Sequence, residues 1–222
     1  MTILALDTTS EFGSLAIRAN GETVAEHALQ SPDGFAHLIF QAIQQLLGDA
    51  RKSLDQIDCF AAASGPGSFT GVRVGLSAVK GLAEAMGKPA VGVSNLRAMS
   101  SFGNLPHRAV VLDARRGEVF AAIYNAQLEI VVPEAVLKFS TWLENLVLTS
   151  YEFIWMSGAP FRTALEGTRF AETPFVEVPR KLAAAVARCA QIDGQSGNWL
   201  DPAALDANYV RRSDAELFWK EP

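Results

Sequence analysis

Residues 64–86 read SGPGSFTGVRVGLSAVKGLAEAM, and this stretch decides how the chain folds. It follows a short apolar strand, Cys59–Ala63. The chain must turn at Gly65-Pro66-Gly67, because proline has no backbone N–H and the flanking glycines permit positive φ. Beyond the turn, Ser68 or Thr70 is placed to cap a helix whose apolar residues repeat at helical spacing. The stretch therefore predicts a strand, a glycine-rich loop and a long helix.

Small residues form a stripe along this helix. Gly67, Gly71 and Gly75 recur at every fourth position, and Ala78 and Gly81 follow on a neighbouring line. Because a glycine inside a helix costs about 1 kcal/mol relative to alanine, the run indicates that something approaches this face closely. Two interpretations stay open: tight packing on the chain's own sheet, and contact with an external partner or with the phosphates of a ligand.

The glycine loop does not match the two common phosphate-binding motifs. A Walker A loop needs GxxxxGK[ST], and a dinucleotide-binding fingerprint needs GxGxxG. Counted from Gly65, both motifs require a glycine where this chain has Thr70. We therefore do not expect either type of phosphate loop here.

Composition limits the classes of protein that the chain can belong to. Its 222 residues are 49% hydrophobic and 19% charged, which is typical of one large or two small globular domains. No apolar run approaches the roughly 20 residues of a membrane span. The N-terminal MTILALDTT lacks the basic start of a signal peptide. Cys59 and Cys189 are expected to be free buried thiols, so a cytoplasmic location is predicted.

The net charge of −5 argues against a large nucleic-acid surface, because such surfaces need clustered lysine and arginine. If the protein acts on RNA, a partner is expected to make most of the contacts.

The order of predicted elements occurs twice. The first half contains strands 2–6, 14–19, 22–29, 59–63 and 90–93, a helix at 35–47, the long helix, and a helix from Ser94 to about Ser101. The second half contains strands 109–112, 119–124, 128–137, 153–156 and 174–178, a helix at 139–148 capped by Ser140 or Thr141, a short helical segment, and a helix at 181–190.

An internal repeat of this kind predicts the architecture. We expect an α/β protein of two tandem βββαβα lobes, each with a mixed sheet flanked by helices. The expected lobes are residues 1–106 and 107–222, with the tail from about residue 199 packed back on the first lobe.

Duplicated lobes of this type resemble the superfamily of actin, sugar kinases and Hsp70, whose lobes are RNase H-like and hold a nucleotide between them. In that superfamily two hairpins that follow an aspartate grip the phosphates. The corresponding residues here are Asp7, Thr8 and Thr9 in the first lobe, and Asp113 and Arg115 in the second. The resemblance makes them a candidate remnant of a nucleotide site and leaves weak binding of ATP or ADP open.

Four segments narrow the resemblance to one family. ALDTT at 5–9, SGPGSFTGVRVGLSAVKGLA at 64–83, LDARRGEVF at 112–120 and YVRRSDAE at 209–216 resemble the TsaB (YeaZ) family of the bacterial tRNA threonylcarbamoyladenosine machinery. Ala207-Asn208 precedes Tyr209 where the family usually has a proline near the tyrosine.

The resemblance implies a subunit without chemistry or a cofactor of its own. Such a subunit binds and activates the catalytic relative TsaD, works with the ATPase TsaE, and forms a homodimer when it is alone. It meets tRNA only through the complex and does not bind membranes.

The residues themselves also argue against metal chemistry. TsaD proteins bind a metal through two histidines four residues apart, and the corresponding positions here are Asn95 and Met99. Neither side chain replaces an imidazole at an iron or zinc site. His27, His37 and His107 are not spaced as HxxxH or HExxH. A metalloprotease, the third function we consider, is therefore disfavoured, whereas an ATPase or kinase of the actin-like superfamily remains the alternative.

The first hypothesis places a partner or dimer interface on the glycine-faced helix and the helix at 35–47. It predicts that Gly75→Leu abolishes binding to TsaD while the subunit stays folded. The residues assigned to this interface are His37, Phe40, Gly67, Phe69, Thr70, Gly71, Arg73, Val74, Gly75, Ser77, Ala78, Gly81 and Leu82.

Overall fold

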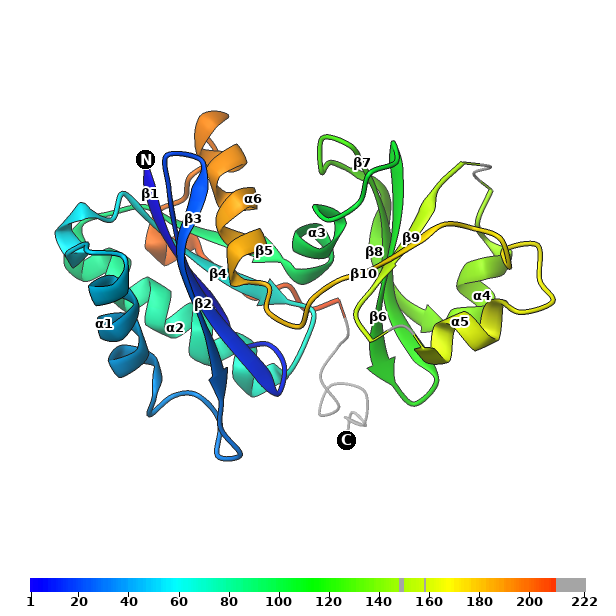
Figure 1. Cartoon of the computed structure of the whole chain (residues 1–222), viewed down its shortest axis with the longest axis horizontal. Helices are drawn as coiled ribbons and strands as arrows, with labels where there is room; N and C mark the ends of the chain where they lie inside the picture. The colour runs from blue at the N-terminus through cyan, green and yellow to red at the C-terminus, as the bar shows by residue number, and fades with distance from the viewer. Residues whose placement is uncertain (148–149, 158, 211–222) are drawn as a thin grey trace, which may run out of the picture.

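The computed structural model of the chain describes residues 1–147, 150–157 and 159–210. Two five-stranded sheets lie side by side, with the strands of the first half in one and those of the second half in the other (Figure 1). Within the described residues, no helix is both long enough and apolar enough to cross a membrane.

The first sheet has the strand order β3-β2-β1-β4-β5. β1 pairs antiparallel with β2 and parallel with β4, with Leu4 opposite Phe60 in the second pairing. β1 and β4 are buried along their whole length, which explains their nearly continuous apolar sequences. The strands are β1 (Thr2–Asp7), β2 (Phe12–Ala19), β3 (Glu22–Gln30), β4 (Cys59–Gly65) and β5 (Ala90–Ser94).

The second sheet repeats this order. Its strands lie in the order β10-β9-β6-β7-β8, so each occupies the position of its counterpart in the first sheet. The predicted pair of mixed-sheet lobes is confirmed. The strands are β6 (His107–Arg115), β7 (Glu118–Asn125), β8 (Ile130–Lys138), β9 (Glu152–Trp155) and β10 (Phe175–Glu177).

Helices cover both faces of each sheet (Figure 1). α1 and α2 pack on one face of the first sheet and α6 on the other, while α4 lies on the outer face of the second sheet and α3 on its inner face. The helices are α1 (Ile39–Asp49), α2 (Phe69–Met86), α3 (Asn95–Ser100), α4 (Phe139–Glu144), α5 (Ala159–Leu165) and α6 (Ala183–Gln195), with short 3-10 turns η1 (Leu54–Gln56) and η2 (Pro202–Ala204).

Successive side chains of β1 point to opposite faces of the first sheet, and each face carries its own hydrophobic core. Leu4 and Leu6 point toward α1 and α2, while Ile3 and Ala5 point toward α6. Cys59 and Cys189 are both free and buried in the second of these cores. Burial raises the pKa of the Cys59 thiol to about 12 and that of Cys189 to about 11, so both remain protonated near neutral pH.

The two lobes share α3. Leu96 and Met99 pack in the core of the second sheet, whereas Ala98 packs with α6 in a core of the first. Arg97 donates two hydrogen bonds of 2.7 Å to the carboxylate of Asp193 in α6. The bidentate hydrogen bonds to Asp193 and the packing of α3 in cores of both lobes hold the helix between the two sheets (Figure 1).

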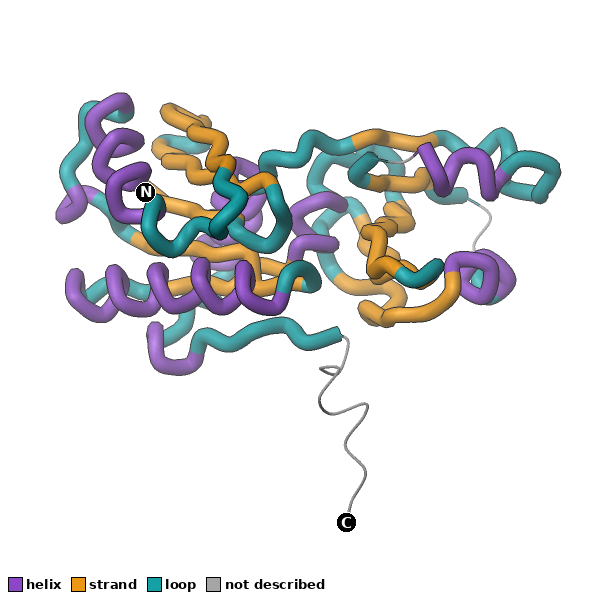
Figure 2. Tube along the Cα trace, turned by 90° about the horizontal axis from the view of Figure 1, so that it is seen from below, coloured by secondary structure: helices purple, strands orange, loops and turns teal. Residues whose placement is uncertain are grey.

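The chain returns to the first lobe after β10. The expected division at 106/107 falls between the two sheets, but α6 belongs to the second half of the sequence and packs on β1, β2 and β4. Residues 199–210 continue along the first lobe, beside α2 (Figure 2). The backbone of Leu200 pairs with that of Ala90, and Leu205 is buried in the first core.

Two predicted helix starts are confirmed and one is wrong. The Ser68 side chain accepts a hydrogen bond from the N–H of Gly71, and Ser94 caps α3. Neither Ser140 nor Thr141 caps α4, because that helix begins at Phe139 after Lys138. α4 also ends at Glu144 rather than at 148, a residue outside the described part. Phe139, Trp142 and Leu143 are buried, so packing rather than a capping side chain stabilises this short helix.

Candidate partner-binding groove

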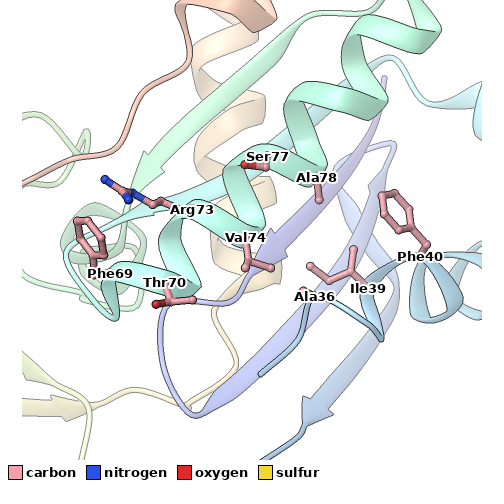
Figure 3. Close-up of a pocket in the computed structure, with 9 residues that line it drawn as sticks. All are labelled: Ala36, Ile39, Phe40, Phe69, Thr70, Arg73, Val74, Ser77 and Ala78. Atoms are coloured by element: carbon pink, nitrogen blue, oxygen red, sulfur yellow. The ribbon is translucent and has the colours of Figure 1, made fainter. Parts of the chain in front are cut away.

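A groove lies between α1 and α2 on the surface of the first lobe (Figure 3). Its cavity volume is about 470 Å³. Six of its nine lining residues are apolar and only one is charged, so the groove favours an apolar occupant over an anion or a sugar. The lining residues are Ala36, Ile39, Phe40, Phe69, Thr70, Arg73, Val74, Ser77 and Ala78.

The helical repeat positions these side chains. α1 buries Ile39, Ala42, Ile43 and Leu46 against the sheet, which leaves Phe40 62% exposed. α2 presents Phe69 at its N-terminal end with 46% of its surface exposed. Large apolar side chains that gather on the surface of a monomer mark interaction sites.

Most of the side chains that the sequence assigned to an interface line this groove. Seven do so: Phe40, Phe69, Thr70, Arg73, Val74, Ser77 and Ala78. His37 is exposed just before α1, Gly81 is exposed further along α2, and Leu82 is half-buried against the first core. The structure thus brings these seven side chains together along one groove, while their contact with a partner stays a prediction.

The C-terminal segment contacts two lining residues at one end of the groove through Tyr209, a contact that sequence reasoning missed. The guanidinium carbon of Arg73 lies 3.7 Å from the centroid of the Phe69 ring, and Arg73 Nε donates a 3.0 Å hydrogen bond to the hydroxyl of Tyr209. The ring centroids of Phe69 and Tyr209 are 5.8 Å apart. Tyr209 lay within a family segment of the sequence, which was the available signal for its role.

Three glycines of the stripe, Gly67, Gly71 and Gly75, pack against the chain itself. A Cβ at Gly67 would lie 2.5 Å from the carbonyl oxygen of Thr9, one at Gly71 would overlap the carbonyl oxygen of Thr8, and one at Gly75 would lie 2.5 Å from Thr8 Oγ1. Thr8 Oγ1 also donates a 2.7 Å hydrogen bond to the carbonyl oxygen of Gly71. The close approach that the stripe indicated is therefore internal, to the loop after β1.

This corrects the expectation for Gly75→Leu. Gly75 is buried and its Cβ position is occupied by Thr8, so a leucine there would disturb the folded lobe. The substitution does not report on a surface. The side of α2 that is open to a partner lies at Thr70, Arg73 and Ser77, which are exposed.

The candidate nucleotide residues of the first lobe form an internal network. Asp7 Oδ1 accepts hydrogen bonds from the Thr9 N–H (3.0 Å) and the Thr9 hydroxyl (2.6 Å). Asn95 Nδ2 donates to Thr9 Oγ1 at 2.6 Å, and Asn95 Oδ1 accepts from the Gly65 N–H at 3.1 Å. The network ties the ends of β1 and β4 to the start of α3.

The candidate nucleotide residues of the second lobe, Asp113 and Arg115, lie exposed at the hairpin between β6 and β7. Asp113 Oδ1 accepts a 2.8 Å hydrogen bond from the N–H of Arg115. Arg115 pairs with Glu118, and Arg116 and Gly117, with φ of 57° and 75°, form the two-residue turn between β6 and β7. Asp7, Thr8 and Thr9 are at most 4% exposed, in contrast to Asp113 and Arg115. Nucleotide binding by the five residues stays a prediction.

The environment of Asp7 makes its ionisation testable. Burial raises the pKa of Asp7 above its ordinary value of 3.8, and the hydrogen bonds from Thr9 and Asn95 offset only part of that effect. The stability that protonated Asp7 contributes is fully present below pH 3.8 and is lost as the pH rises through the folded pKa. Asparagine does not titrate, so the unfolding free energy of Asp7→Asn relative to the wild type should increase from about pH 4 to about pH 7.

Urea denaturation at a series of pH values measures this difference. Only the change of this free-energy difference with pH is informative. An effect of altered hydrogen bonding that does not depend on pH shifts the difference equally at every pH. A relative stability that falls over the same range would show that folding lowers the pKa of Asp7, contrary to the effect of its burial.

The positions that correspond to the TsaD histidines are occupied by structural residues. Asn95 belongs to the network at β1, and Met99 is buried in the core of the second sheet. His27 lies 2.7 Å from a carboxylate oxygen of Asp49, and His107 lies 3.3 Å from the carbonyl oxygen of Ser150. Across residues 1–147, 150–157 and 159–210, no three His, Cys, Asp or Glu side chains gather to hold a metal ion.

Comparisons with known proteins agree with the motifs. A family model described as TsaD, tRNA N6-adenosine threonylcarbamoyltransferase, matches residues 31–189. The chain is 32% identical to the tRNA threonylcarbamoyladenosine biosynthesis protein TsaB of Bacillus subtilis over 151 residues, which are 66% of each chain. It is 38% identical to TsaB of Escherichia coli over 129 residues, or 56% of this chain and 55% of the relative. The solved structure of YeaZ from Pseudomonas aeruginosa superposes with a TM-score of 0.77 at 25% identity and covers 94% of this chain and 99% of YeaZ.

The chain belongs to the TsaB/YeaZ family. The sequence alignments span about half to two thirds of the length of these curated TsaB relatives. The structural match to YeaZ extends over nearly the whole of both chains, so the two-lobed actin-like fold is that of the family. Membership links the chain to tRNA threonylcarbamoyladenosine biosynthesis.

Proposed function

We propose that this TsaB-family chain binds and activates a TsaD-type threonylcarbamoyltransferase through the groove between α1 and α2, and that it performs no chemistry itself. The observation that carries the proposal is the groove, where Phe40 and Phe69 remain exposed beside half-buried Val74. A helical surface of this kind suits the apolar face of a partner helix. A second copy of the chain is proposed to occupy the same groove when TsaD is absent.

The polar residues of the fold support a non-catalytic role. In actin-like enzymes the loop after β1 is expected to meet phosphates, but here Asp7, Thr8 and Thr9 are bonded to the chain itself. Asn95 and Met99 stand where TsaD proteins have their metal-binding histidines. The net charge of −5 also favours a protein partner over direct tRNA binding, which we assign to the complex with TsaD and TsaE.

Reconstitution of the modification tests the proposal. TsaD, TsaE, tRNA, ATP and the threonylcarbamoyl donor are combined with and without this chain, and modified adenosine is measured by mass spectrometry. We expect modification only when both TsaD and this chain are present. Modification by this chain without TsaD would show an enzyme, and full modification without this chain would show that it activates nothing.

A further inference from the structure

The segment 205–210 contacts both lobes, and its Tyr209 contacts two of the residues that line the groove. On the first lobe, Leu205 is 1% exposed in the core, and the N–H of Asn208 donates a 2.8 Å hydrogen bond to the carbonyl oxygen of Ser64. A Cβ on Gly65 would lie 3.1 Å from the carbonyl oxygen of Asn208, so the absence of a side chain there lets the segment lie against β4. These contacts place the segment at the carboxyl end of the first sheet.

The second lobe holds the same segment through two side chains, Val210, which packs against the core of the second sheet, and Asn208. Asn208 Nδ2 donates a 2.6 Å hydrogen bond to Oε2 of Glu134, which lies on β8. The other carboxylate oxygen, Oε1, accepts from the hydroxyls of Ser94 and Tyr124. Burial and then the Glu134 carboxylate raise the pKa of Tyr124, which keeps its hydroxyl a donor. Glu134 therefore joins Ser94 of the first lobe, Tyr124 of the second, and the C-terminal segment.

The residue after Asn208 reaches the partner groove. Tyr209 contacts Phe69 and Arg73, two of the groove's lining residues, and is itself 50% exposed. Only one peptide bond separates the side chain held by the second lobe from the side chain that borders the groove on the first.

From this arrangement we infer that Tyr209 forms part of the partner-binding surface and that Glu134, through Asn208, positions it. Partner affinity at the α1/α2 groove then depends on a carboxylate of the other lobe. The inference rests on the proposed function of the groove and extends it. On this inference, the segment 205–210 couples the position of the second lobe relative to the first to partner binding at the groove. Glu134 is then a positioning residue.

Four variants separate positioning from general stability. Asn208→Ala and Tyr124→Phe each remove one hydrogen bond to Glu134, but only the first removes a contact between the segment and Glu134. Tyr209→Ala removes the contacting ring, while Tyr209→Phe keeps the ring on Phe69 and loses the hydrogen bond to Arg73.

Hydrogen exchange on the chain alone tests the first step. Peptides that cover residues 205–210 are followed by mass spectrometry. We expect exchange about tenfold faster in Asn208→Ala, which corresponds to the loss of a hydrogen bond to a charged group, and little change in Tyr124→Phe. Equal exchange in Asn208→Ala and the wild type would overturn the positioning role.

Affinity for the TsaD subunit tests the second step. We expect binding about tenfold weaker in Asn208→Ala and Tyr209→Ala, with Tyr124→Phe close to wild type and Tyr209→Phe between the two. If Val74→Glu abolishes binding while Asn208→Ala and Tyr209→Ala bind normally, the inference is wrong and the groove proposal stands. If Val74→Glu also binds normally, the groove proposal itself is wrong.

Discussion

Gly71→Ala should destabilise the chain strongly, whereas Gly81→Ala on the same helix should stabilise it. The Cβ of an alanine at residue 71 would overlap the carbonyl oxygen of Thr8. The backbone at Thr8 has little freedom to move away from this Cβ, because the neighbouring Thr9 carbonyl oxygen accepts a 2.6 Å hydrogen bond from the Ser68 N–H. We expect a loss of about 3 kcal/mol in the free energy of unfolding, at the upper end of the range for overpacking.

Gly81 is the matched control. Nothing lies within 4 Å of its Cβ position, and it is exposed in the interior of α2. Alanine there removes the helix penalty of glycine and should add about 0.5–1 kcal/mol. Urea denaturation of both variants measures the contrast. Similar effects at the two positions would contradict the assignment of the stripe to internal packing against Thr8 and Thr9.

Val74→Glu should reduce binding to a TsaD-type partner by at least about 100-fold. Val74 points into the groove between the two helices (Figure 3). A carboxylate placed there would have to be desolvated against Ile39 and Phe40 when a partner covers the groove. A hundredfold loss corresponds to about 2.7 kcal/mol, which is the size of effect found at the centre of an interface.

Two further variants make this result interpretable. Ala85→Glu places the same charge on an exposed part of α2 outside the groove and should bind normally. Phe40→Ser alters a side chain that is 62% exposed, so it should weaken binding without disturbing the fold. Circular dichroism checks folding, and calorimetry with purified TsaD measures affinity. Normal binding by Val74→Glu would place the interface elsewhere, and normal binding by Phe40→Ser would remove Phe40 from it.

The sequence predicted the elements better than it predicted their contacts. The strand–loop–helix at Cys59–Met86 and the caps Ser68 and Ser94 are local features, and the structure has them. The cap expected at Ser140 or Thr141 is wrong, because a polar residue near a helix start is only one of several ways to begin a helix. Buried Phe139 and Trp142 decide the position of α4 instead.

The candidate groove was partly visible in the sequence. The sequence assigned Thr70, Arg73, Val74 and Ser77 to an interface, and the structure places them on one face of α2 because residues three and four apart on a helix lie side by side. Ala36, Ile39 and Tyr209 were not assigned to the site, because their roles depend on how other segments pack beside α2.

The sequence by itself determined the repeat and the two mixed-sheet lobes, since periodicity and turn residues act over a few positions. The tertiary structure decided what the glycines face, which lobe α6 covers and where the C-terminal segment lies. Those outcomes depend on pairs such as Thr8 with Gly71 and Glu134 with Asn208, which are 63 and 74 residues apart. Contacts at such separations form only when the whole chain has folded, so no local spacing encodes them.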